Sequence, residues 1–181
     1  MNFIKLFLAA IFLFLTFSAI ADFKSALLLA NQGDASAQSQ LGEIYYKGQG
    51  VTQSDAEAFK WFKLAAEQGN VDAQNHLGYM YEYGQYVTRN ETEAVDWFRL
   101  AANQGHVSAQ NHLGNMYYWG IGVTVSYTEA AKWYHLAAQQ GNFSAVNQLK
   151  LLQKLEIEST SEIPIKKIDN TSENDPLNIR D

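Results

Sequence analysis

Two histidines stand at the same place in two copies of one short motif. The sequence AQNHLG occurs at 73–78 and again at 109–114, which puts His76 and His112 36 residues apart. Histidine is the commonest metal ligand and a frequent general base, so a matched pair suggests a shared metal ion or acid–base catalysis. A structural unit copied along the chain would produce the same pattern without any chemistry. To decide between these two interpretations, we consider the structural elements in which the two histidines lie.

The rest of the chain repeats with the same period of 36 residues. The recurring positions include Ala37, Ala73 and Ala109; Leu41, Leu77 and Leu113; Gly42, Gly78 and Gly114; and Trp61, Trp97 and Trp133. Each unit also closes on the motif LAAxQG. A fixed period in the range of about 20–50 residues is typical of a solenoid or array. His76 and His112 are therefore one repeat position seen twice, and Gln40 and Gln148 occupy the same position in the flanking copies.

Each unit is predicted to form two helices. Ala73, Leu77, Met80 and Tyr81 recur with helical spacing, and so do the apolar residues around Trp97, which we expect to be buried in the core. Ser54, Asn90 and Ser126 each precede a glutamate by three residues, which indicates an N-cap at the start of every second helix. Gly78 and its equivalents lie within the first helix, where we expect them to permit the close approach of a neighbouring helix.

From the sequence we expect no metal site, no cofactor and no enzymatic activity. Equivalent positions in stacked helices stand about 10 Å apart, whereas two zinc ligands must both lie about 2 Å from the metal. The chain has no cysteine and no HExxH, GxSxG or P-loop motif. Its G-x-G pairs, at 48–50 and 120–122, fall between the helices and are interpreted as turns. A formal net charge of −6 without a basic cluster argues against nucleic-acid binding.

The units resemble the Sel1-like repeat, a relative of the tetratricopeptide repeat, in their shared motifs AxxxLGxxYxxGxGV and AxxWFxLAAxQG. Tyr86 departs from the pattern because it replaces the second turn glycine. The resemblance implies an all-α fold, a right-handed α-solenoid of stacked helix-turn-helix repeats, that acts as a binding scaffold. We expect a capping helix at 22–33, repeats at 34–69, 70–105 and 106–141, and a second capping helix at 142–158.

The two ends of the chain differ from the repeats. Residues 1–21 have a short basic start, an apolar run and the small-residue ending Ala19-Ile20-Ala21, which predicts a cleaved secretory signal peptide. An uncleaved membrane anchor is the alternative; after cleavage we expect no stable membrane insertion. The protein would then be exported, to the periplasm in a bacterium or outside the cell. The polar stretch 159–181 contains both prolines and is predicted to be a disordered tail.

The resemblance places the first helices along a concave groove, where a protein or peptide partner would bind. The residues predicted to form this site are Asn75, Tyr79, Glu82, Tyr83, Asn111, Asn115, Tyr118 and Trp119; the first unit contributes Ser39, Glu43, Tyr46 and Lys47. Amides can pair with an extended backbone, and rigid aromatic rings supply contact area. Tyr79 and Tyr118 could equally pack against the next unit. A peptidoglycan or carbohydrate ligand, and a purely structural spacer, are the alternative functions.

Overall fold

The structure is a computed structural model that describes residue 7 and residues 22–161, with side chains up to residue 154. The predicted signal peptide, apart from residue 7, and the tail from residue 162 onward lie outside the described residues. Residues 22–31 are helical. The remaining helices are α2 (Ala35–Lys47), α3 (Asp55–Glu67), α4 (Val71–Tyr83), α5 (Glu91–Asn103), α6 (Val107–Trp119), α7 (Tyr127–Gln139) and α8 (Phe143–Ser161). No strand occurs in the described part of the chain, which confirms the all-α solenoid.

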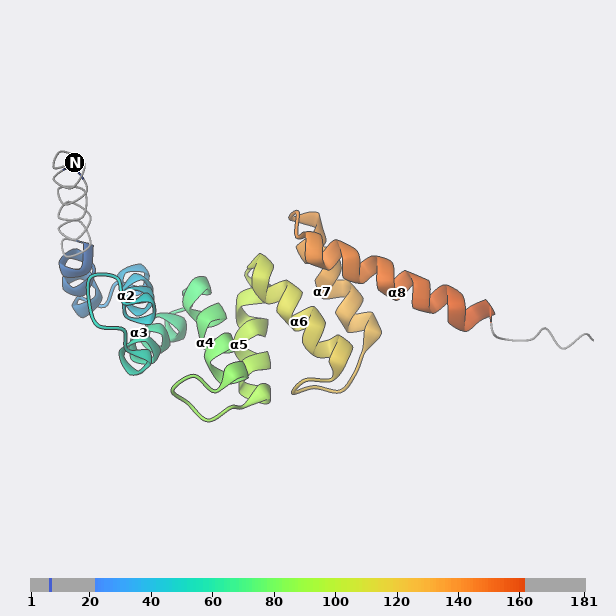
Figure 1. Cartoon of the computed structure of the whole chain (residues 1–181), viewed down its shortest axis with the longest axis horizontal. Helices are drawn as coiled ribbons and strands as arrows, with labels where there is room; N and C mark the ends of the chain where they lie inside the picture. The colour runs from blue at the N-terminus through green and yellow to red at the C-terminus, as the bar shows by residue number, and fades with distance from the viewer. Residues whose placement is uncertain (1–6, 8–21, 162–181) are drawn as a thin grey trace, which may run out of the picture.

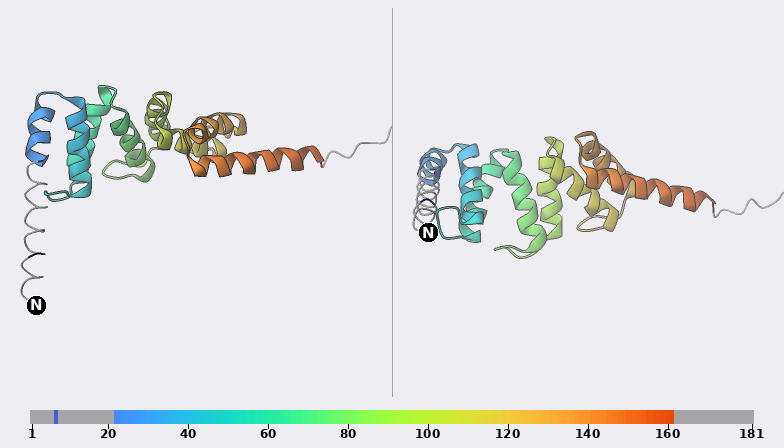
Figure 2. Two further views of the ribbon diagram at one scale, coloured as in Figure 1. Left: turned by 90° about the horizontal axis from the view of Figure 1, so that it is seen from above. Right: turned by 45° about the horizontal axis from the view of Figure 1, so that its top comes forward.

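The helices follow one another along a single long axis, from the helix at residues 22–31 at one end to α8 at the other (Figure 1). Each helix packs mainly on its neighbours in sequence, and the most extensive contacts join α2 to α3, α4 to α5 and α6 to α7. Each pair lies within one of the repeats predicted at 34–69, 70–105 and 106–141. The other views show the same linear order, with α8 extending beyond the stack (Figure 2). No helix in the described residues is long and apolar enough to cross a bilayer.

Local capping chemistry fixes where the helices begin. The side chains of Ser54, Asn90 and Ser126 accept hydrogen bonds from backbone amides three residues on, which confirms the predicted N-caps of α3, α5 and α7. The first helices have caps of their own: Asp34, Asn70 and His106 begin α2, α4 and α6 in the same way. α8 runs to Ser161, three residues past the predicted end of the C-terminal capping helix.

One aromatic ring from each second helix fills the space beside the glycine of the first. Phe62, Phe98 and Tyr134 are fully buried, and an ideal Cβ on Gly78 would lie 2.6 Å from the ring of Phe98. The mid-helix glycine therefore permits close packing, as predicted, although the neighbour is a ring rather than a helix backbone. The expectation for Trp97 was wrong: it is only partly buried against the core, because the adjacent Phe98 takes the inward position.

Glutamine side chains connect successive units. Nε2 of Gln74 donates to the backbone oxygen of Ala66, and Nε2 of Gln104 donates to Oε1 of Gln74 at 2.8 Å. The same pair of bonds recurs one unit later, at Gln110 and Gln140. Each pair satisfies polar groups where one unit meets the next, and therefore helps to set the register of the stack.

Tyr86 adopts the backbone conformation of the glycine that it replaces. Its φ is 65°, and it is the one non-glycine residue with positive φ in the described part of the chain. A side chain in this left-handed region costs about 1 kcal/mol or more. The centroid of the Tyr86 ring lies 5.6 Å from that of Phe59 of α3.

Candidate binding surface

Two hollows lie next to each other on the surface formed by the first helices. The larger, about 420 Å³, has walls from α2 and α4 and from the N-cap of α6. Polar side chains line it, among them Ser39, Glu43, Asp72, Asn75, His76 and His106. We call it the polar pocket. The second hollow, about 350 Å³, is lined by Tyr46, His76, Tyr79, Met80, Tyr83 and Gln85, and we call it the aromatic pocket. His76 is common to both.

Two of the three asparagines of the predicted site are buried rather than exposed on this surface. Asn75 is 7% exposed and Asn111 is 9% exposed, whereas the sequence suggested that they face away from the core. Neither side-chain oxygen has a hydrogen-bond partner. A buried polar atom left without a partner costs about 1–3 kcal/mol. The same unpaired amide occurs in two successive units, and Ser39 occupies the equivalent position in the first.

The two histidines pack against aromatic rings of the preceding unit. His76 stacks on Phe62, with ring centroids 4.4 Å apart, and His112 stacks on Phe98 at 5.3 Å. Burial lowers the pKa of both imidazoles below the ordinary value, so both are neutral at pH 7. Among the described residues, no group of His, Cys, Asp and Glu side chains is arranged to hold a metal ion.

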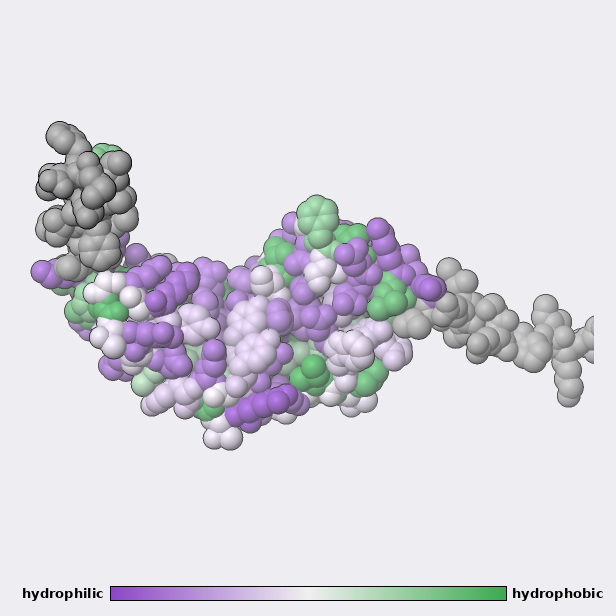
Figure 3. Space-filling view, in the orientation of Figure 1, coloured by the Kyte–Doolittle hydropathy of each residue, from purple (hydrophilic) through white to green (hydrophobic). Residues whose placement is uncertain are grey.

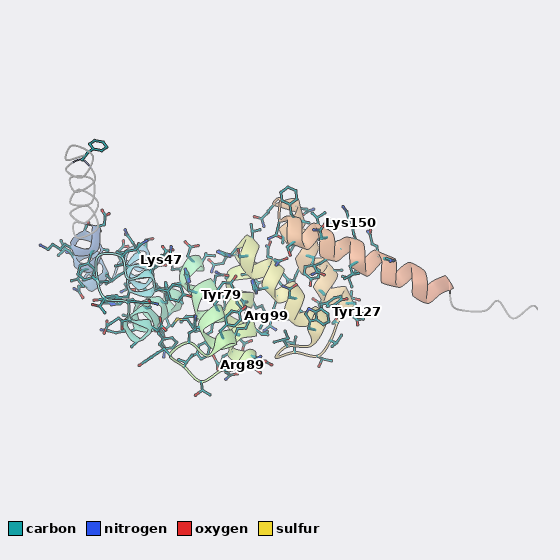
Figure 4. All side chains as sticks on the ribbon, viewed as in Figure 1. Lys47, Tyr79, Arg89, Arg99, Tyr127 and Lys150 are labelled. Carbon is teal, nitrogen blue, oxygen red and sulfur yellow. The ribbon has the colours of Figure 1, made fainter. Side chains whose placement is uncertain are left out.

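The predicted aromatic residues divide into packed and exposed members. Tyr79 packs against Phe98 and His112 of neighbouring helices, which favours the packing interpretation for this residue. Burial raises its pKa to about 12, so its hydroxyl stays protonated and can donate a hydrogen bond. Tyr83, with its ring parallel to that of Tyr79, is 61% exposed. Figure 4 shows Tyr79 on α4, one unit along the array from Lys47 on α2.

The third unit carries a related set of side chains. Trp119 is 65% exposed, and Tyr118 packs between it and Tyr127, with ring centroids 4.6 Å and 5.3 Å away. Asn115 is already satisfied, because its Oδ1 accepts a hydrogen bond from the hydroxyl of Tyr134 at 2.8 Å. Asn115 is therefore a packing residue, whereas the Trp119 side chain is free to meet a partner.

Glu82 stands where the other units have tyrosine. Its side chain is only 14% exposed, and Oε2 lies 3.8 Å from Nδ1 of His112. Burial raises the pKa of the Glu82 carboxyl, and nearby Arg89 opposes this shift. The imidazole of His112 is held neutral by burial alone, so the two side chains do not form a strong ion pair.

Sequence reasoning named Glu43 but missed Asp72, the second carboxylate of the polar pocket, and His106 beside it. Asp72 lies in the first turn of α4, and its Oδ1 is 3.5 Å from Nε2 of His106. His106 is held in place because its Nδ1 accepts a hydrogen bond from the backbone amide of Ala109. Both residues lie at helix starts and not on the helix face opposite the core. The one sequence feature that could have pointed to Asp72 is its position as an acidic residue in the first turn of α4.

Stacked helix pairs with a period of 36 residues define an α-solenoid repeat protein. The model of the Sel1 repeat matches residues 35–70, 71–106 and 107–142. The chain belongs to the Sel1 repeat family. Sel1 repeats commonly mediate protein–protein interactions, and the family is generally non-catalytic.

Solved structures of other repeat proteins resemble this one. A Sel1 repeat protein from Oxalobacter formigenes is 42% identical, with a TM-score of 0.65, over 72% of this chain and 96% of that one. The protein c5321, described as a protective antigen of uropathogenic Escherichia coli strains, is 41% identical with a TM-score of 0.72; the match covers 75% of this chain but only 29% of c5321. Cysteine-rich protein B of Helicobacter pylori, 23% identical with a TM-score of 0.56, shares the fold over 71% of this chain and 95% of its own. No curated protein matches the chain.

Proposed function

We propose that this chain is an exported adaptor without enzymatic activity, which binds a segment of another protein along the concave groove of its first helices. The observation that carries the proposal is the pair of buried, unpartnered amides of Asn75 and Asn111. An extended peptide has backbone donors and acceptors that could satisfy such amides in successive units. Tyr83 and Trp119, both largely exposed at equivalent positions, would supply apolar contact on the groove rim.

Export is proposed from the N-terminal sequence and not from the fold. The apolar segment ends on Ala19-Ile20-Ala21, followed by Asp22, which is the pattern of a signal-peptide cleavage site. The similarity to a protective antigen is in keeping with export. N-terminal sequencing of the mature protein should begin at Asp22, and a mature chain that still begins at Met1 in the membrane fraction would favour the anchor.

Site-specific photo-crosslinking tests the adaptor function. A photo-reactive amino acid would be placed at Tyr83 or Trp119 in the native cell. Matched exposed positions on the second helices, Leu64 and Leu100, serve as controls. We expect a discrete crosslinked protein from the first two positions and none from the controls. Crosslinks confined to the controls would move the site to the outer face, and no crosslink at any position would remove support for an adaptor.

A carbohydrate or peptidoglycan ligand is the second candidate. The polar pocket combines carboxylates, amides and hydroxyls beside the tyrosines of the aromatic pocket, and sugars use the same groups. Ligand binding to the native state raises the melting temperature by mass action. A cell-wall fragment that raises the melting temperature of the chain, and not that of an Asn75→Leu variant, would favour this alternative.

A further inference from the structure

The chemistry of the two pockets differs although they adjoin at His76. The polar pocket carries carboxylates from two helices, Glu43 of α2 and Asp72 of α4, and no lysine or arginine lines it. The aromatic pocket has no charged lining residue; its floor is the buried Met80 and its walls are tyrosines. A ligand that crosses both pockets thus meets negative charge on one side of His76 and an apolar surface on the other.

The interactions that face the negative charge of the polar pocket are weak ones. Burial lowers the pKa of His76, so its imidazole adds no positive charge at neutral pH. Lys47 pairs with Glu43, but both side chains are about half exposed, and an exposed ion pair of this kind stabilises by about 1 kcal/mol or less. His106 approaches Asp72 at 3.5 Å, while that carboxylate remains 76% exposed. A cationic group can therefore approach both carboxylates without breaking a strong interaction.

Asn75 provides an independent sign that the polar pocket receives a ligand. It lines the pocket, is more than nine-tenths buried, and makes no side-chain hydrogen bond through its oxygen. The protein itself does not satisfy this amide, so an incoming polar group can do so at a small cost in desolvation. The amide lies beside the carboxylates, where it can pair with the backbone of a peptide whose side chain carries the positive charge.

The aromatic pocket is suited to an apolar side chain. Tyr79 and Tyr83 present parallel rings with centroids 6.2 Å apart, and Nε2 of Gln85 hydrogen-bonds the hydroxyl of Tyr46, at 3.5 Å, across the units. These contacts join the side chains of the pocket to one another without a ligand, and such preorganisation reduces the entropy lost on binding. A volume of about 350 Å³ admits one large aliphatic or aromatic side chain.

We propose that the groove between α2 and α4 selects a peptide segment in which a lysine or arginine stands close to a large apolar residue. The basic side chain enters the polar pocket between Glu43 and Asp72, and the apolar one enters the aromatic pocket against Tyr79 and Met80. In an extended segment, residues two apart point to the same side and lie about 7 Å from each other. This spacing suits two pockets that share one lining residue. The inference rests on the proposed peptide-binding function.

Selection from a library of random short peptides tests this preference. The full chain is the bait, and the Asn75→Leu/Asn111→Leu variant removes peptides that bind elsewhere. We expect enriched peptides to carry Lys or Arg at a fixed short distance from a large apolar residue. Enrichment of acidic peptides, or of peptides without a basic residue, would overturn the proposal; so would a failure to enrich any peptide while cell-wall fragments bind.

Charge variants identify the pocket responsible. Glu43→Gln/Asp72→Asn should weaken binding of the enriched peptide by about tenfold or more, since it removes both carboxylates that face the cation. Glu67→Gln/Asp96→Asn makes the same charge change at exposed positions of α3 and α5 and should leave the affinity within about twofold. Equal loss in both variants would show that the preference is only long-range attraction and would overturn the pocket assignment. If a partner crosslinks at Tyr83 but the enriched peptides show no preference for Lys or Arg, this inference is refuted while the proposed adaptor function is still supported.

Discussion

The ring of Phe98 occupies the space into which a side chain on Gly78 would project. An ideal Cβ on Gly78 lies 2.6 Å from Cδ1 and Cε1 of that ring, and the same ring stacks on His112 of the next unit at 5.3 Å. One aromatic residue on a second helix thus sets the distance to the first helix of its own unit and to that of the following one. The contact with the glycine recurs at Phe62 and Tyr134, and Phe62 also stacks on a histidine of the next unit, His76. The pairing of glycine and ring is therefore the packing rule of the array.

Gly78→Ala should destabilise the protein although alanine is the better helix former. The gain in helix propensity is about 1 kcal/mol, whereas forcing a methyl group into a closely packed site typically costs about 1–3 kcal/mol, and here the contact is far below van der Waals distance. Chemical denaturation gives the change in unfolding free energy. The double variant Gly78→Ala/Phe98→Leu should recover part of the loss. A more stable Gly78→Ala protein would contradict the packing described.

Phe98→Ala should cost much more stability than Trp97→Ala. Truncation of a fully buried phenylalanine costs about 3–5 kcal/mol, and Phe98 has no exposed surface, whereas Trp97 is only partly buried. Thermal and chemical unfolding of the two variants, side by side, provide the comparison. Equal losses, or a larger loss at Trp97, would show that the register of the second helices is wrong.

Gln104→Ala should destabilise the stack because it leaves the side-chain oxygen of Gln74 without a hydrogen-bond donor. Gln104 donates to Oε1 of the buried Gln74 and to the backbone oxygen of Gly69. An acceptor left unpaired in a buried place costs about 1–3 kcal/mol. Exposed Gln49 offers a matched control, and Gln49→Ala should change the unfolding free energy by no more than about 0.5 kcal/mol. Indistinguishable variants would mean that the glutamine contacts do not join the units.

Stability should fall as the pH drops below about 6.5, because His76 and His112 are buried as neutral imidazoles. Burial depresses the pKa of both histidines in the folded protein, so the unfolded chain binds more protons between the ordinary pKa and the depressed one. Their contribution is present above the unfolded pKa and is lost as pH falls through the folded pKa. His76→Gln/His112→Gln should flatten this part of the stability profile; Gln40, at the same repeat position, shows that the unit accepts glutamine.

Glu82 affects the pH dependence of stability in the opposite direction to the two histidines. Burial raises its pKa in the folded state, so the folded protein holds a proton at pH values where the unfolded chain has released it. Stability then decreases as the pH rises through this window. The histidine comparison is therefore best made in a Glu82→Gln background. A profile in that background that does not change on removal of the two histidines would contradict their buried neutral state.

The sequence predicted the elements of the fold because the repeat displays each constraint several times. Capping residues at Ser54 and Asn90, and the inward Leu77 and Leu113, depend only on spacing within one helix. Spacing within one helix does not show whether Trp97 or Phe98 is the core residue, because both adjacent residues fit the helical pattern. The position of the partner helix determines which of the two side chains is buried. The glutamine bonds join residues 30 apart, for which no local signal exists.

The sequence placed the candidate site on the first helices but did not predict which of its side chains are exposed. The first helices do carry the two pockets, yet Asn75, which lines the polar pocket, and Asn111, which lines neither pocket, are both buried. Asn115 was expected to meet a partner and instead bonds Tyr134. Most of the surface seen in Figure 3 is hydrophilic, so hydropathy alone would not have separated the pockets from the rest of the array.

Asn75→Leu/Asn111→Leu is the most direct test of peptide binding on the first helices, because it separates binding from folding. The two amides lack partners for their oxygens, so apolar residues of similar size should leave the unfolding free energy equal or higher. The photo-crosslink at Tyr83 should nevertheless disappear. Asn31→Leu/Asn103→Leu, at exposed positions outside the groove, should keep both stability and crosslink. A groove variant that is clearly less stable yet still crosslinks its partner would show that the asparagines serve the fold and that the partner binds elsewhere.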